Sequence, residues 1–330
     1  MDETHQVRIL DLHSKAPLID LHADTFSSAR RTTNFLDGWP KKHLDLPRMF
    51  DCGLWAEAFS LFVYPRWGGG QSSRWLEVAN RELANIELAV EASDGRFAIA
   101  RNSAEILQNK ENGSVSAIIE IEGLHSLGGD LELIDSFFER GVRIFTLTWN
   151  NSNEWATSCM DSKAQTVGLT ADGRTAVERI DKLGGLIDFS HSGERTFWDA
   201  MEIITRPPIC THSCCSSLKD SPRNLTDEQI SAIIDKAGII GINFYPGFLS
   251  SKETEHVTAA DIVNHIEHIL SFDGEENVGL GSDFDGIRYL PADMSDCTGL
   301  SNVTREMINR GFPENRILKI LGSNFLRVFS

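Results

Sequence analysis

Eight short apolar runs, each followed by a segment of helical spacing, constrain the fold of this 330-residue chain more than any other feature. Such alternation is typical of parallel strands joined by crossover helices. Eight units predict a closed (β/α)8 TIM barrel, with an open doubly wound sheet as the alternative. Barrels reach this length as one domain, so we expect residues 1–330 to form a single domain. The runs occupy residues 17–24, 58–64, 116–122, 143–149, 186–191, 209–212, 239–245 and 278–283.

Helical patterns fill most of the segments between these runs. A capping signal, Thr226 followed three residues later by Gln229, marks the start of one of them. Residues 22–49, in contrast, show little periodicity and predict a long loop, of the kind that often covers a functional site. The predicted helices span residues 74–93, 131–140, 174–183, 194–204, 226–238, 259–271, 303–310 and 313–329.

The composition argues against several kinds of partner. A hydrophobic content of 41% and a charged content of 24% are ordinary for a soluble globular protein. The net charge of −17, without a basic run, argues against nucleic acid and anionic membranes. The chain shows no secretory signal and no membrane-spanning stretch, and its six cysteines form no disulfide framework. We therefore expect a cytoplasmic protein.

Metal-ligand residue types recur at the ends of the predicted strands. His22 and Asp24 end the first run, and because residues two apart in a strand point to the same face, both can reach one ion. The C-terminal strand ends of such a barrel converge on one mouth. Histidines and carboxylates without a cysteine pattern indicate a divalent metal and favour zinc over calcium, with manganese or iron as alternatives. The other strand-end ligands are Glu122, His191, His212 and Asp283.

Each of these residues also has a purely structural interpretation. A strand-end histidine such as His191 can simply bind a backbone carbonyl. Glu120 shares a face with Glu122, so either can form an ion pair, and Glu122 is preferred because it lies nearer the strand end. Asp285 stands in the same relation to Asp283. The residue pattern alone leaves these alternatives open.

Motifs that include these strand ends are similar to those of one enzyme family. They are LIDLHAD, IEIEGLHSL, RIFTLTWNNSNEW, GGLIDFSH, PICTHSCC, SPRNLTDEQI, GINFY, VGLGSDFDG and ILGSNFLRVF, and they span nearly the whole chain. In this order they resemble the renal (membrane) dipeptidase family, a branch of the amidohydrolase-like, metal-dependent barrels. The opening His-x-Asp is a discriminating feature, since most amidohydrolase-type barrels open with His-x-His.

The resemblance implies a binuclear centre of two zinc ions. Carried onto this sequence, His22 and Asp24 hold one zinc, His191 and His212 hold the other, and Glu122 bridges the two.

The resemblance also implies roles in catalysis and substrate binding. Asp283 handles the proton, and Arg223 holds the carboxylate of the substrate. Trp149 stands where the mammalian members have a histidine thought to contact the substrate. An indole N–H donates a hydrogen bond but cannot carry a proton or a positive charge at neutral pH, so the substrate range is expected to differ. Tyr245 is expected to line the substrate pocket, with a packing role as the alternative.

The combined prediction is a zinc-dependent dipeptidase that hydrolyses dipeptides with a free C-terminus through a metal-bridging hydroxide. The resemblance further implies an L-Xaa-D-Xaa preference and a homodimer, with a small peptide as partner and neither nucleic acid nor membrane. One alternative is a related binuclear-metal barrel hydrolase that acts on another amide, a lactone or a phosphoester. A non-catalytic metal-binding protein is less favoured, because metal storage needs neither Asp283 nor Arg223.

Overall fold

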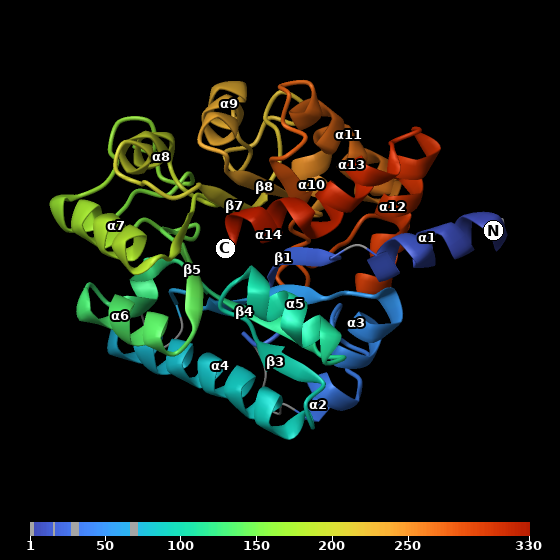
Figure 1. The fold of residues 1–330 in the computed structure, drawn as a ribbon. Coiled ribbons are helices and arrows are strands. Elements are labelled where there is room, and N and C mark those ends of the chain that lie inside the picture. The colour runs from blue at the N-terminus through green and yellow to red at the C-terminus, as the bar shows by residue number, and fades with distance from the viewer. Residues whose placement is uncertain (1–2, 16, 28–32, 67–71) are drawn as a thin grey trace.

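The computed structural model describes residues 3–15, 17–27, 33–66 and 72–330, and within them eight parallel strands close into a barrel (Figure 1). Closure follows from the pairings, because β1 pairs with both β2 and β9, and β2 pairs with β4. The predicted TIM barrel is confirmed. The barrel strands are β1 (Ile19–Ala23), β2 (Ala56–Phe62), β4 (Val115–Glu122), β5 (Val142–Thr146), β6 (Leu186–Asp188), β7 (Ile209–Ser213), β8 (Ile239–Ile242) and β9 (Val278–Leu280).

A ninth strand, β3 (Phe97–Ile99), was not among the predicted ones. It pairs with the first half of β4, where Phe97 lies opposite Val115 and Ile99 opposite Ala117. The second half of β4 pairs with β5 from Ile119 onward. The extra strand therefore lengthens the sheet at one edge without entering the barrel.

Helices surround the barrel, and each predicted helical segment contains at least one (Figure 1). The predicted capping signal is confirmed, since the hydroxyl of Thr226 accepts from the backbone N–H of Gln229 at 3.2 Å and Gln229 Oε1 accepts from the N–H of Thr226 at 2.9 Å. Two of the longer helices were missed, α1 (Glu3–Lys15) and α5 (Ser103–Glu111). The predicted ones are α4 (Ser72–Ala92), α6 (Glu132–Glu139), α7 (Ala171–Leu183), α8 (Glu194–Met201), α9 (Asp227–Asp235), α11 (Ala259–Leu270) and α12 (Leu300–Asn309). Shorter elements are η2 (Leu124–Leu127), α10 (Pro246–Leu249), η3 (Thr254–His256) and η4 (Cys297–Gly299).

The predicted last helix, residues 313–329, is broken into three pieces. These are α13 (Glu314–Leu318), the π-helical turn η5 (Lys319–Ser323) and α14 (Asn324–Val328). Gly322 lies at the break, and a Cβ there would come within 1.7 Å of the carbonyl oxygen of Pro17. The chain end therefore packs directly against the segment that enters β1.

The long loop predicted for residues 22–49 is only partly correct. It contains α2 (Thr33–Asp37) and the start of α3 (Leu46–Cys52), while residues 28–32 lie outside the described part of the chain. The side chain of Asp45 caps α3 by accepting from the N–H of Arg48 at 3.0 Å. Helices of five and seven residues are too short to show a helical period in the sequence.

Four of the predicted strands end three residues earlier than expected, and this difference places two functional residues on loops. The sheet ends at Asp188 in β6 and at Leu280 in β9, so His191 and Asp283 lie on the loops just beyond it. Both residues have left-handed backbone conformations, with φ of 65° and 62°. Such conformations cost about 1–3 kcal/mol for a non-glycine residue and are found most often at functional sites. β5 and β8 likewise stop at Thr146 and Ile242.

We expect Gly281→Ala to lower the free energy of unfolding by about 1–3 kcal/mol, because it overpacks the barrel. A Cβ at this position would lie 1.8 Å from the carbonyl oxygen of Thr211. Gly279→Ala is the matched control, because its Cβ would meet only movable side-chain ends, Cδ1 of Ile239 at 3.3 Å and Cδ1 of Leu21 at 3.5 Å. Urea unfolding of both variants measures the difference, and equal stabilities would contradict this reading of the packing.

Candidate active site

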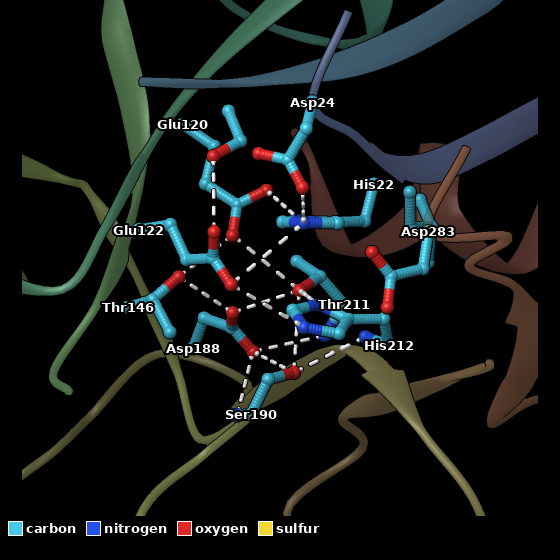
Figure 2. A network of polar contacts seen from close by, with 12 residues as sticks. His22, Asp24, Glu120, Glu122, Thr146, Asp188, Ser190, Thr211, His212 and Asp283 are labelled. Atoms are coloured by element: carbon cyan, nitrogen blue, oxygen red, sulfur yellow. Dashed lines mark hydrogen bonds and ion pairs between the residues drawn. The ribbon is translucent and has the colours of Figure 1, made fainter. Parts of the chain in front are cut away.

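Three histidines, His22, His191 and His212, surround Glu122 at the barrel mouth. Figure 2 labels Glu122, His22 and His212. Oε1 of Glu122 lies 3.0 Å from Nε2 of His191, 3.6 Å from Nε2 of His212 and 3.9 Å from Nε2 of His22. The two nitrogens of His191 and His212 are 3.0 Å apart. The predicted ligands of β1, β4 and β7, and of the loop after β6, therefore meet at one place.

Two aspartates complete this cluster on the side of His22. Oδ2 of Asp24 lies 3.6 Å from Nε2 of His22. Ligand atoms of His22, Asp24 and Asp283 lie within 4.8 Å of one another, as do those of His22, Glu122 and His212. Both groups have the spacing that a metal ion needs. His22 belongs to both groups. Five of the six predicted strand-end residues therefore lie in a group that could hold a metal ion, and the sixth, His191, contacts Glu122 directly.

A polar network below the cluster fixes the orientation of His22 (Figure 2). Nδ1 of His22 lies 3.0 Å from Oε2 of Glu120. The Thr146 hydroxyl lies 2.6 Å from Oε1 of Glu120 and 2.7 Å from Oδ2 of Asp188. This arrangement leaves Nε2 of His22 facing the cluster, as is usual for histidines that bind metal.

The same network orients His212. Its Nδ1 lies 2.8 Å from the hydroxyl of Thr211, which in turn lies 2.8 Å from Oδ2 of Asp188. Asp188, Thr146 and Thr211 were not predicted. Each lies within a predicted strand, but a carboxylate or hydroxyl that contacts only another buried side chain leaves no pattern of its own in the sequence.

The second ring nitrogen of His191 is held by a neighbouring loop. Its Nδ1 lies 2.9 Å from Oδ1 of Asn150. All three histidines therefore have one nitrogen engaged by a polar partner and the other directed at the cluster.

Burial and mutual repulsion shift the pKa values of the site's carboxyls. Burial raises the pKa of Asp283 to about 6 and that of Glu120 to about 7. Burial, together with the charge of Asp24, raises the pKa of Glu122 well above its usual value. A bound cation reverses this tendency, because it stabilises the ionised form of each neighbouring carboxylate.

The histidines differ among themselves. Burial and the charge of Arg223 lower the pKa of His191 well below its usual value, and burial and the charge of His22 do the same for His212. Burial opposes protonation of His22, but the carboxylates of Glu120 and Glu122 outweigh it and raise the pKa of this residue. Neutral imidazoles bind metal, so two of the three are already in the binding form.

The residues present fit a metal ion. Nε2 of His22 and Oδ1 of Asp24 are buried and have no hydrogen-bond partner among the described residues. Leaving such groups buried and unpaired is costly, and the site concentrates several of them. A divalent cation that binds nitrogen and oxygen ligands satisfies both atoms at once.

The contacts of Asp283 and Asp285 differ and favour Asp283 as the functional residue. Asp285 accepts from the hydroxyl of Thr25 at 2.6 Å and from the backbone N–H of His43 at 2.7 Å, so it ties two loops together. Asp283 accepts one hydrogen bond, from Nδ2 of Asn243 at 3.0 Å, and otherwise faces the cluster. Asp283 therefore remains the candidate for proton transfer.

A cavity of about 580 Å³ opens above the cluster, and the predicted substrate-binding residues line it. Arg223 is 5% exposed, and its Nη2 donates to the carbonyl oxygen of His212 at 3.2 Å. Its Nε and Nη1 have no partner among the described residues. Two buried guanidinium nitrogens thus have N–H donors left for a ligand.

Aromatic side chains form one wall of this cavity. Trp149 packs against Phe62 with ring centroids 5.0 Å apart, and Tyr245 packs edge-on against Phe248 at 4.8 Å. The ring of Trp149 also lies 6.2 Å from that of His191. The structure thus places Trp149 beside His191 and Tyr245 in the lining of the same cavity.

Comparison with known proteins agrees with this geometry. A profile of the membrane dipeptidase family (peptidase family M19) matches residues 6–330. The chain belongs to this family. Its enzyme class is therefore metallo-dipeptidase, a hydrolase acting on peptide bonds.

Among the similar proteins, an uncharacterized dipeptidase of Schizosaccharomyces pombe is 29% identical over 328 residues, which cover 95% of this chain and 80% of that protein. The crystal structure of dipeptidase AC, an M19 metallopeptidase, has a TM-score of 0.88 and 29% identity, and the match covers 95% of this chain and 98% of that one. A Rhodobacter sphaeroides metallopeptidase, crystallised with a phosphinate mimic of the dipeptide L-Ala-D-Ala, has a TM-score of 0.88, 27% identity and the same coverage.

The helices of the described residues include none with the length and apolar character of a membrane span.

We expect Glu120→Gln to weaken divalent-metal binding by about 10- to 100-fold, because the variant removes the charge opposite Nδ1 of His22. Competition between the protein and a chromogenic chelator measures the affinity without any activity assay. Glu57→Gln is the matched control. Glu57 is also fully buried, but neither of its carboxylate oxygens has a hydrogen-bond partner among the described residues, so it orients no candidate ligand. Equal losses in the two variants would refute this role of Glu120.

Proposed function

We propose that this protein is a zinc-dependent dipeptidase that cleaves dipeptides with a free C-terminus. The observation that carries the proposal is the position of Arg223, which lines the same cavity as several of the metal-ligand residues and whose buried Nε and Nη1 have no partner among the described residues. A buried guanidinium with free N–H donors suits a carboxylate, to which it can form charge-assisted hydrogen bonds.

Five residues would hold the metal. We assign His22 and Asp24 to one zinc, His191 and His212 to the other, and Glu122 to a bridging position. Two such ions supply an activated water and a Lewis acid for the scissile carbonyl.

The chain's own side chains supply the rest of the chemistry. Arg223 binds the terminal carboxylate and so orients the peptide bond over the cluster. Asp283 accepts the proton of the attacking water at its carboxylate and passes it to the departing amine. The amide of Asn243, which donates to Oδ2 of Asp283, keeps that carboxylate pointed at the cluster. The indole N–H of Trp149 offers a neutral donor at the cavity wall.

An L-Xaa-D-Xaa preference is the finer part of the proposal, and the Rhodobacter relative with its bound L-Ala-D-Ala mimic supports it. The test is metal analysis of the purified protein combined with a dipeptide library in which the configuration of each residue varies. We expect hydrolysis that a chelator abolishes and zinc restores. Hydrolysis of lactones or phosphoesters, but of no dipeptide, would refute the proposal. The homodimer and the cytoplasmic location stay predictions.

Asp283→Asn is expected to retain zinc and to lose a factor of about 10²–10⁴ in kcat, because the amide cannot take a proton. Steady-state kinetics with metal analysis of the same sample measure both quantities. Asp285→Asn is the comparison, and we expect it to lose less activity, since Asp285 is engaged by Thr25 and His43. A zinc-loaded Asp283→Asn enzyme with normal turnover would exclude the proton-transfer role.

Arg223→Ala is expected to raise KM for dipeptides by about 10- to 100-fold, since a hydrogen bond to a charged group contributes about 1.5–3 kcal/mol. A dipeptide amide provides the control, because it lacks the carboxylate. The wild-type enzyme should discriminate against the amide, and the variant should not. Unchanged dipeptide kinetics in Arg223→Ala would remove the carboxylate clamp from the proposal.

A further inference from the structure

A second cavity, of about 540 Å³, adjoins the one above the metal-ligand cluster. The loops after β5, β6 and β7 form it. The two cavities share four residues, His191, Ser221, Pro222 and Arg223. Arg223 therefore stands at the junction between them.

The walls of the two cavities differ in chemistry. Apolar groups are prominent in the first, where Phe62, Trp149, Met160, Tyr245, Phe248 and Ile287 line the space. The second is lined by serines and amides together with three carboxylates, those of Asp161, Glu194 and Asp220. Among the described residues that line it, Arg223 is the only arginine or lysine. Lys219, next to Asp220 in the sequence, has its ammonium 3.4 Å from the hydroxyl of Ser251.

The buried guanidinium of Arg223 links these cavities to the substrate. Its Nη2 donates to the carbonyl oxygen of His212, and its buried Nε and Nη1 have no partner among the described residues. A carboxylate bound to these N–H groups places the α-carbon of the C-terminal residue at the junction of the two cavities. It also neutralises Arg223, so the charge that remains in the second cavity is that of its three carboxylates.

We propose that the second cavity binds the side chain of the C-terminal residue and selects a long cationic one, such as that of lysine or arginine. The inference rests on the proposed function and deepens it, because it names the substrate class. The N-terminal side chain then lies against the aromatic wall of the first cavity, so the enzyme sorts the two side chains of a dipeptide by polarity.

The test compares leucyl-lysine, leucyl-norleucine and leucyl-glutamate on the zinc-loaded enzyme, each with the C-terminal residue in the D and in the L configuration. Lysine and norleucine have side chains of similar length and differ in charge. We expect kcat/KM for lysine to exceed that for norleucine by about three- to tenfold, with glutamate lowest, because exposed ion pairs each contribute up to about 1 kcal/mol. High salt should reduce the preference.

Two variants connect the preference to the cavity. Asp220→Asn and Glu194→Gln alter exposed residues, and each should lower the lysine-to-norleucine ratio by about two- to fivefold. Glu178→Gln, an exposed position in α7 outside the lining of both cavities, is the matched control and should keep the ratio.

The outcomes separate the two proposals. A ratio near one, or a ratio that neither cavity variant changes, overturns the inference while dipeptide hydrolysis itself stands. Failure to hydrolyse any dipeptide of the library overturns the proposed function and the inference with it.

Discussion

The crowding of carboxylates at the barrel mouth is the constraint on which the rest of the structure depends. Asp24, Glu120, Glu122 and Asp283 surround three histidines in a site with little access to water. The raised pKa values of the last three show how unfavourable their ionised forms are there. Burying several like charges together is tolerated only when they are compensated. A divalent cation compensates them, so the composition of the site and its metal dependence have one cause.

Holding such groups together requires a rigid frame, and the closed sheet provides it. The network of Glu120, Thr146, Asp188 and Thr211 connects β4, β5, β6 and β7 by side-chain hydrogen bonds. The same bonds orient His22 and His212. The same hydrogen bonds thus connect neighbouring strands of the barrel and orient the candidate metal ligands. A change that breaks one of them should affect both the stability of the barrel and the geometry of the site.

The barrel could be predicted from the sequence because apolar runs alternate with helical patterns, and the cluster could be predicted because its residues lie at the ends of those runs. Eight apolar runs gave the strand order, and the strand ends gave His22, Glu122 and His212, which the structure brings together. Contacts between buried side chains leave no such signal, which is why Asp188 was missed. Strand ends were also overestimated, since the left-handed backbone of Asp283 follows from tertiary packing and cannot be read from residue preferences.

In the proposed function, Arg223 joins substrate recognition to the metal-ligand cluster. Its Nη2 donates to the backbone carbonyl of His212, so a carboxylate bound to its other N–H groups has a fixed position relative to that histidine. Near-attack geometry depends on such positioning to within about an ångström. The ring of Trp149 lies 6.2 Å from that of His191, and its indole offers one neutral donor at most. In the proposed function, the terminal carboxylate of a bound peptide is oriented by Arg223, and the inferred selectivity depends on the two cavities that share this residue.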